Sequence, residues 1–315
     1  MRRRAFGTTG LQVSELGLGC ARIGGIFQRD ASAFITLLER ARDEGINFFD
    51  TADMYSQGES EALLGRAFQR RRDQVIIASK VGYCLPTQRR LIARVKPLVR
   101  PLIRLLRIKR ENLPAAVRGE VRQNFAPAYI RSAVEASLRR LRSDYLDLLQ
   151  LHSVPADVVR RGDWLEALEA LQRAGKIRFY GISSDTLESA SAALEYPKVA
   201  SLQVQVSLLE QSFAQAIAPR AKQQNVAIIA RECLANGLLV KAEGEIDPRQ
   251  YWSTPERLET GLAALAGYRE AARAQNKPLA RMALEYASGV DAVAVALIGV
   301  RSVEQLDATL RAYRG

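Results

Sequence analysis

The chain is poor in the residues that bind metals or form disulfides. Its 315 residues include one histidine and three cysteines. Cys20, Cys84 and Cys233 lie far apart and include no Cys-x-x-Cys pair, which argues against both a disulfide framework and a zinc site. A single histidine also excludes a His-rich metal site. We therefore expect no metal centre in this protein.

Long apolar segments and the common nucleotide-binding motifs are missing too. No run of about 18 apolar residues is present that could cross a membrane. Met1 is followed by arginines without the apolar core of a signal peptide, so we expect a cytoplasmic protein. The sequence has no Gly-x-Gly-x-x-Gly after its first predicted strand and no Gly-x-x-x-x-Gly-Lys-Ser/Thr, which excludes a Rossmann fingerprint and a P-loop.

Strand-like and helix-like runs alternate along the chain, which is the pattern of βα units around a parallel sheet. Eight apolar runs predict strands: Glu15–Cys20, Phe48–Ala52, Val75–Val81, Tyr145–His152, Ile177–Ser183, Leu202–Ser207, Val226–Leu234 and Val293–Gly299. Predicted helices include Ala31–Glu44, Ser60–Arg71, Ala128–Arg142, Trp164–Ala174 and Phe213–Gln224. The predicted fold is α/β, a (β/α)8 TIM barrel in a single domain over residues 1–315, with Asp247–Pro255 as a polar loop above the site.

Four polar side chains stand at or just beyond the ends of predicted strands. They are Asp50, Tyr55, Lys80 and His152. The carboxyl ends of the strands build the active site of a parallel α/β barrel, so we expect these residues to be neighbours. We interpret them as the catalytic residues.

These side chains have the chemistry that carbonyl reduction by hydride requires. A tyrosine with an ordinary pKa of about 10 is a poor proton donor at neutral pH. A Lys80 ammonium against the Tyr55 hydroxyl would lower the pKa of the tyrosine, and Asp50 would hold Lys80 in place. His152, through a ring nitrogen, can hydrogen-bond the substrate carbonyl and set its angle to the hydride.

Each of these residues alone has an ordinary explanation. A tyrosine after a strand is usually an amphipathic lid residue, a lysine there is usually solvated, and an Asp-Thr-Ala turn is usually a helix N-cap. The joint pattern favours catalysis. His152 supports it most strongly, because a lone imidazole after an apolar strand has no obvious partner outside the barrel mouth.

Several longer motifs occur in the order found in a known family: Phe6–Ser14, Gly45–Ala52 with Gly58–Gly65, Tyr129–Arg131 leading into Ser137–Asp147, and Gly175–Ser184. Over nearly its whole length the chain resembles the aldo-keto reductases. The resemblance implies an N-terminal β-hairpin that closes the barrel bottom. It also implies an NADP-dependent oxidoreductase that interconverts a small carbonyl compound (aldehyde, ketone or sugar) and an alcohol. In that family's terms, Tyr55 is the acid, Lys80 and Asp50 tune it, and His152 orients the substrate.

The resemblance also implies where a nicotinamide cofactor binds. NADP(H) is expected and NAD(H) is the alternative, with Arg301 as the best remaining partner for a 2′-phosphate. The expected cofactor-binding residues are Ser183, Ser184 and Gln203 at the carboxamide, Arg231, the run from Leu234 through Gly237 to Leu239 at the pyrophosphate, and Gly299, Arg301 and Gln305 at the adenosine end.

The chain departs from the family pattern at the cofactor. Ser184 replaces a common asparagine, and a hydroxyl can make only one of the two hydrogen bonds to an amide. Arg231 stands where an aromatic residue often stacks beneath the nicotinamide, although a planar guanidinium can stack as well. Gln305 and Thr309 replace the familiar arginine and asparagine.

Positive charge is concentrated in one segment. Residues 84–124 contain eleven basic and two acidic residues, so they hold nine of the twelve net positive charges. We interpret the segment as a long basic insertion after the third barrel strand. On a helix, its basic side chains would share one face and its apolar side chains the other: Lys96, Arg100, Arg104 and Arg107 against Leu98, Leu102, Leu105 and Ile108.

Three roles for this insertion are open. It can be a rim helix with solvated charges, a lid that attracts an anionic substrate, or a surface for acidic lipid or an acidic partner. Nucleic-acid binding ranks last, because the insertion lacks interleaved aromatic residues and a known motif. For the whole chain, the alternative to an enzyme is a non-catalytic nucleotide-sensing or partner-binding subunit on the same fold. The presence of all four predicted catalytic residues, Asp50, Tyr55, Lys80 and His152, favours the enzyme.

Overall fold

Eight parallel strands close into a barrel in the computed structural model, which describes residues 1–24, 31–84, 122–242 and 244–315. In order around the barrel they are β3 (Leu16–Gly19), β4 (Phe48–Asp50), β5 (Ile76–Val81), β8 (Leu146–Leu151), β9 (Ile177–Ser183), β10 (Ser201–Gln205), β11 (Ala227–Arg231) and β12 (Val293–Ile298), and β12 pairs with β3. The antiparallel hairpin of β1 (Arg3–Ala5) and β2 (Gln12–Ser14) precedes them. The predicted (β/α)8 barrel and its N-terminal hairpin are confirmed.

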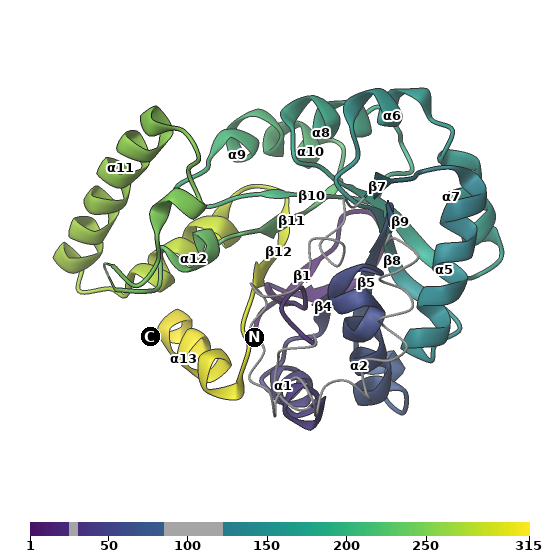
Figure 1. Ribbon diagram of the computed structural model, residues 1–315, viewed down its shortest axis with the longest axis horizontal. Coiled ribbons are helices and arrows are strands. Elements are labelled where there is room, and N and C mark those ends of the chain that lie inside the picture. Colours follow the sequence, from purple (N-terminus) through teal and green to yellow (C-terminus); the bar gives the residue numbers. More distant parts are fainter. Residues whose placement is uncertain (25–30, 85–121, 243) are drawn as a thin grey trace, which may run out of the picture.

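Helices surround the barrel strands (Figure 1). The α-helices are α1 (Ala31–Asp43), α2 (Glu59–Phe68), α5 (Pro127–Leu141), α6 (Ala156–Arg161), α7 (Leu165–Arg173), α8 (Leu187–Ala193), α9 (Ser212–Ala216), α10 (Ala218–Gln223), α11 (Pro255–Ala274), α12 (Leu279–Gly289) and α13 (Val303–Arg314). Short 3-10 helices are η1 (Tyr55–Gly58), η2 (Arg72–Gln74), η4 (Ala235–Gly237) and η5 (Pro248–Gln250). In Figure 1, α11 projects outward, with α12 between it and the barrel.

One predicted helix is wrong. The segment Phe213–Gln224 is not a single helix, because α9 ends at Ala216 and α10 begins at Ala218. Pro219 occupies the first turn of α10, where its missing N–H is tolerated. In the interior of a continuous helix the same proline would remove a hydrogen bond and clash with the preceding turn.

The barrel interior is apolar at its bottom, toward the amino ends of the strands, and polar at its mouth, toward their carboxyl ends. Side chains alternate between the two faces of a strand, so residues two apart point the same way. Phe48 on β4, Ile76 and Ala78 on β5, and Leu148 on β8 pack in one apolar cluster with the hairpin residue Phe6. The Phe6 and Phe48 rings are 5.8 Å apart. The hairpin therefore plugs the bottom of the barrel. The next inward residue on each of these strands is polar, and Asp50, Lys80 and Gln150 form the floor of the mouth.

The basic insertion is described only at its two ends. After β5, the pair β6 (Tyr83–Cys84) and β7 (Arg122–Gln123) forms a short antiparallel hairpin. Residues 85–121, including the predicted basic and apolar helix faces, lie outside the described residues. Among the helices that are described, none combines the length and apolar character needed to span a bilayer.

Candidate active site

The structure brings the four predicted catalytic residues together at the carboxyl ends of the strands. Asp50 ends β4, Lys80 lies on β5, and His152 directly follows β8. Tyr55 begins η1, in the loop after β4. The Tyr55 and His152 rings meet edge to face with 5.8 Å between their centroids.

Lys80 is the centre of this cluster and is fully buried. Its Nζ donates to Asp50 Oδ2 at 2.6 Å, to the Thr51 carbonyl at 3.0 Å and to Tyr55 Oη at 3.2 Å. An ammonium has three N–H donors, so all of them are used. Because Tyr55 Oη accepts from Lys80, its own proton is left for another acceptor.

Asp50 is held by more than Lys80. Its Oδ1 accepts from Gln203 Nε2 at 2.7 Å and from Gln150 Nε2 at 3.4 Å. Gln150 is fully buried on β8 and pairs in register with Lys80. The sequence prediction missed Gln150, although a polar residue at an inward position of an apolar strand was a usable signal.

The pKa values match acid chemistry, with one correction. Burial raises the pKa of Tyr55 above its usual range, and Lys80 lowers it by a smaller amount. Lys80 therefore acts in the predicted direction, but the net pKa of Tyr55 in the resting site is raised, because burial and the charge of Asp50 outweigh the ammonium. Burial opposes the charge of Lys80, but Asp50 and Tyr55 outweigh it and raise the pKa of Lys80. Burial, followed by the charges of Lys80 and Arg231, holds the pKa of His152 well below 6.5, so its imidazole is neutral.

The predicted carboxamide residues lie on β9 and β10, next to this cluster. Ser183 ends β9 and is buried, and Ser184 follows it with its hydroxyl 3.0 Å from Ser189 Oγ. Gln203 lies two residues after the start of β10, and its amide nitrogen is bound to Asp50. The structure therefore joins the carboxamide candidate Gln203 directly to the catalytic cluster.

Arg231, at the end of β11, crosses to the loop after β9. Its guanidinium forms an ion pair with Asp185 at 2.5 Å and a second one with Glu232, and Nη2 also donates to the Ser184 carbonyl at 3.4 Å. The two carboxylates fix the guanidinium across the end of β10. Its charge lies close enough to lower the pKa of both Tyr55 and His152.

The predicted pyrophosphate segment is a tight turn after β11. Leu234 precedes η4, and Gly237 in η4 has a left-handed φ of 106° that favours glycine. Leu239 is fully buried, so the structure does not expose this predicted residue to a ligand. The polar loop Asp247–Pro255 also reaches the mouth, because Tyr251 Oη accepts a 2.7 Å hydrogen bond from Gln205 at the end of β10.

A pair of arginines marks the predicted adenosine end. Arg301 follows β12, Arg22 follows the neighbouring strand β3, and a Cβ added at Gly299 would meet no atom within 4 Å. Partial desolvation lowers the pKa of Arg22, and the charge of Arg301 lowers it further. Two neighbouring guanidinium groups suit a phosphate ester. The sequence prediction missed Arg22.

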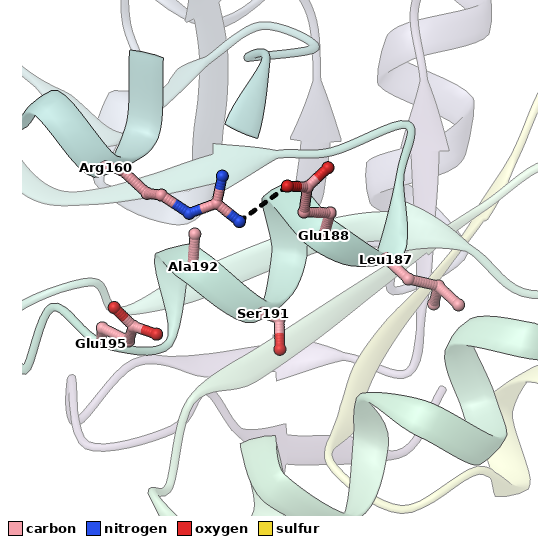
Figure 2. Close-up of a pocket in the computed structure, with 6 residues that line it drawn as sticks. All are labelled: Arg160, Leu187, Glu188, Ser191, Ala192 and Glu195. Carbon is pink, nitrogen blue, oxygen red and sulfur yellow. Dashed lines mark hydrogen bonds and ion pairs between the residues drawn. The ribbon is translucent and has the colours of Figure 1, made fainter. Parts of the chain in front are cut away.

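Gln305, in contrast, is used within the protein. Its Oε1 accepts the backbone N–H of Arg301 at 2.9 Å, at the start of α13. The described residues hold no group of three or more His, Cys, Asp or Glu side chains arranged for a metal. A surface pocket of about 410 Å³ involves α6 and α8 (Figure 2), but none of the candidate site residues lines it.

Comparisons with known proteins agree with this geometry. The model of the Aldo/keto reductase family matches residues 15–314. The chain is 29% identical over 323 residues to pyridoxal 4-dehydrogenase from Microbacterium luteolum, covering 96% of this chain and 90% of the relative. It is 27% identical over 320 residues to L-galactose dehydrogenase from Arabidopsis thaliana, covering 98% and 87%.

A solved structure is similar as well. The holo form of aldo-keto reductase AKR11C1 from Bacillus halodurans superposes with a TM-score of 0.78 at 30% identity, covering 100% of this chain and 91% of that one. The chain therefore belongs to the aldo-keto reductase family, the oxidoreductases that interconvert carbonyl compounds and alcohols with a nicotinamide nucleotide.

Proposed function

We propose that this protein is an NADP(H)-dependent reductase of small carbonyl compounds in which Tyr55 is the general acid. One observation carries the proposal: the buried Lys80 ammonium bonds Asp50 and Tyr55 at the same time. This arrangement supports a tyrosine that stays protonated at rest and whose phenolate is stabilised once its proton is lost.

The residues of the chain divide the reaction between them. A nicotinamide cofactor held at the barrel mouth would supply the hydride to the carbonyl carbon. His152, neutral and facing Tyr55, hydrogen-bonds the carbonyl oxygen and orients it. Tyr55 donates its proton to the same oxygen as the alcohol forms, and Lys80 stabilises the resulting phenolate.

The cofactor is held by residues around the mouth. In this proposal Ser183, Ser184 and Gln203 hold the carboxamide, the turn Leu234–Leu239 the pyrophosphate, and Arg22 with Arg301 the 2′-phosphate. The substrate is a small aldehyde, ketone or sugar, in keeping with the names of relatives that act on pyridoxal and L-galactose. A single-domain, cytoplasmic protein stays a prediction, as does an anionic substrate.

A turnover assay tests the proposal. Purified protein is mixed with NADPH and a panel of aldehydes, ketones and sugars, and the loss of NADPH absorbance is followed. We expect consumption of NADPH with at least one substrate. NADPH binding without turnover of any substrate would favour the non-catalytic nucleotide-sensing subunit instead.

The arginine pair makes a separate prediction about cofactor choice. Arg301→Ala and Arg22→Ala should each weaken NADPH binding by roughly 1.5 to 3 kcal/mol, or about 10- to 150-fold, because a charge-assisted contact to the 2′-phosphate is lost. NADH, which lacks this phosphate, is the internal control and should bind as before. Equal weakening of both cofactors, measured by fluorescence titration, would contradict the assignment.

A further inference from the structure

The hairpin β6–β7 is rooted at the end of the strand that carries Lys80. Gly82 has a left-handed φ of 138°, and its carbonyl accepts the Asn124 N–H at 2.8 Å. A Cβ added at Gly82 would come within 2.4 Å of the Phe125 ring, which therefore packs directly on the glycine backbone. The Tyr129 hydroxyl donates to the Tyr83 carbonyl at 3.0 Å. These contacts fix the base of the hairpin to the barrel rim.

Both strands of this hairpin contact His152. The Tyr83 ring on β6 meets the His152 ring edge to face, with 4.8 Å between centroids and an interplanar angle of 82°. On β7, Gln123 Nε2 donates to the carbonyls of His152 at 3.3 Å and Ser153 at 2.8 Å. Tyr83 and Gln123 are partners in the hairpin register, so one residue pair contacts both the ring and the backbone of His152.

The backbone changes direction directly after His152, at Ser153. Ser153 has a φ of 52°, a left-handed value that is uncommon for residues other than glycine. The chain therefore turns away from β8 here, and the Gln123 amide binds the two carbonyls at this turn.

Within the part of the chain that the structure describes, the ring of His152 also lacks the usual anchor. An active-site histidine is commonly oriented by a hydrogen bond to its second ring nitrogen. Here Nδ1 is buried and has no hydrogen-bond partner among the described residues. The described contacts that bear on the angle of the imidazole are its edge-to-face contacts with the Tyr55 and Tyr83 rings.

We propose that Tyr83 and Gln123 are positioning residues that hold the His152 imidazole in the orientation needed to bind the substrate carbonyl. This role rests on the proposed function of His152. Neither residue is assigned to the reaction itself: Tyr83 sets the plane of the ring, and Gln123 sets the backbone that carries it.

The single histidine of this chain makes the proposal directly observable. In protein labelled with 15N-histidine and free of cofactor, the imidazole signals report only on His152. We expect one sharp set of imidazole signals in the wild type, as a ring held in one orientation gives. In Gln123→Ala and Tyr83→Leu, these signals should broaden or split, because the ring samples several orientations. The kcat for the preferred carbonyl substrate should fall about tenfold or more, while the Kd for NADPH stays the same.

Two variants serve as controls. Tyr83→Phe keeps the ring edge and should retain the wild-type spectrum and kcat. Gln172→Ala removes a similar exposed hydrogen bond, from Gln172 Nε2 to the Arg178 carbonyl at 2.7 Å, away from His152 and should change neither. Wild-type imidazole signals in both Gln123→Ala and Tyr83→Leu would overturn the positioning role. Absence of turnover in the wild type would instead overturn the proposed function, because the spectrum is recorded without catalysis.

Discussion

At the scale of single residues, the buried carboxylate of Asp50 explains why a lysine can stay charged inside the barrel. An isolated charge in such a place is costly, and it becomes acceptable when it is paired and hydrogen-bonded. Asp50 accepts from Lys80 on one oxygen and from Gln203 and Gln150 on the other. The two amides hold Asp50, Asp50 holds Lys80, and Lys80 holds Tyr55.

His152 gives a pH prediction at the same scale. Its pKa lies well below 6.5 in the folded protein and near 6.5 in the unfolded chain. Below pH 6.5 the unfolded state therefore binds a proton that the folded state does not, and stability falls as the pH falls. The slope approaches about 1.4 kcal/mol per pH unit between about pH 6.5 and 5.

Urea unfolding across this range checks the prediction. No other histidine contributes, because the chain has only one. Asp247 and Glu285 have lowered pKa values, so their contributions are lost only as the pH falls through the more acidic range below about 4.5. His152→Gln should lose much of the slope above pH 5. If the free energy of unfolding fell equally with pH in the wild type and in His152→Gln, the pKa of His152 would be the same in the folded and unfolded states, which would contradict the prediction.

At the scale of elements, the turn that carries Tyr55 packs against α5 and leads into α2. Ser56, Gln57 and Gly58 have successive left-handed φ angles of 51°, 64° and 85°. The Arg140 side chain of α5 packs against Gly58 and pairs with the fully buried Glu61 of α2 at 2.6 Å. Glu61 also accepts from Ser79, the neighbour of Lys80 on β5, at 2.6 Å. The ion pair therefore connects the strained turn to the catalytic strand.

Arg140→Ala should destabilise the protein by about 3 kcal/mol. The variant leaves the Glu61 carboxylate buried without its cation, and the cost lies at the low end for such losses because the Arg140 side chain is 30% exposed. The matched control is Arg160→Ala, which removes the ion pair with Glu188 (Figure 2); the two side chains are 53% and 64% exposed. It should cost at most about 1 kcal/mol. Equal losses in chemical denaturation would contradict a supporting role for Arg140.

At the scale of the whole molecule, the repeating pattern of the sequence predicts the barrel well. Each barrel strand is a short apolar run, and polar residues at the strand ends meet because parallel strands place their carboxyl ends on one rim. Asp50, Lys80 and His152 follow from this rule alone, and Tyr55 follows from its place in the next loop.

What the sequence could not predict depends on contacts between distant segments. The sign of the Tyr55 pKa shift depends on burial, which no local pattern reports. Gln123 reaches His152 from the far end of a long insertion, and Arg22 comes near Arg301 only because β3 and β12 are neighbours in the closed barrel. Pro219 indicated a break between α9 and α10, but the apolar periodicity continues across it and favoured one helix.

The central claim is that Tyr55 donates the proton, and one substitution tests it most directly. Tyr55→Phe keeps the ring that packs against His152 and removes only the hydroxyl that Lys80 bonds. We expect kcat for the preferred carbonyl substrate to fall by about 10² to 10⁴, the range for general acid catalysis, while NADPH binds as before. A variant with near wild-type kcat would show that another group supplies the proton and would contradict the account.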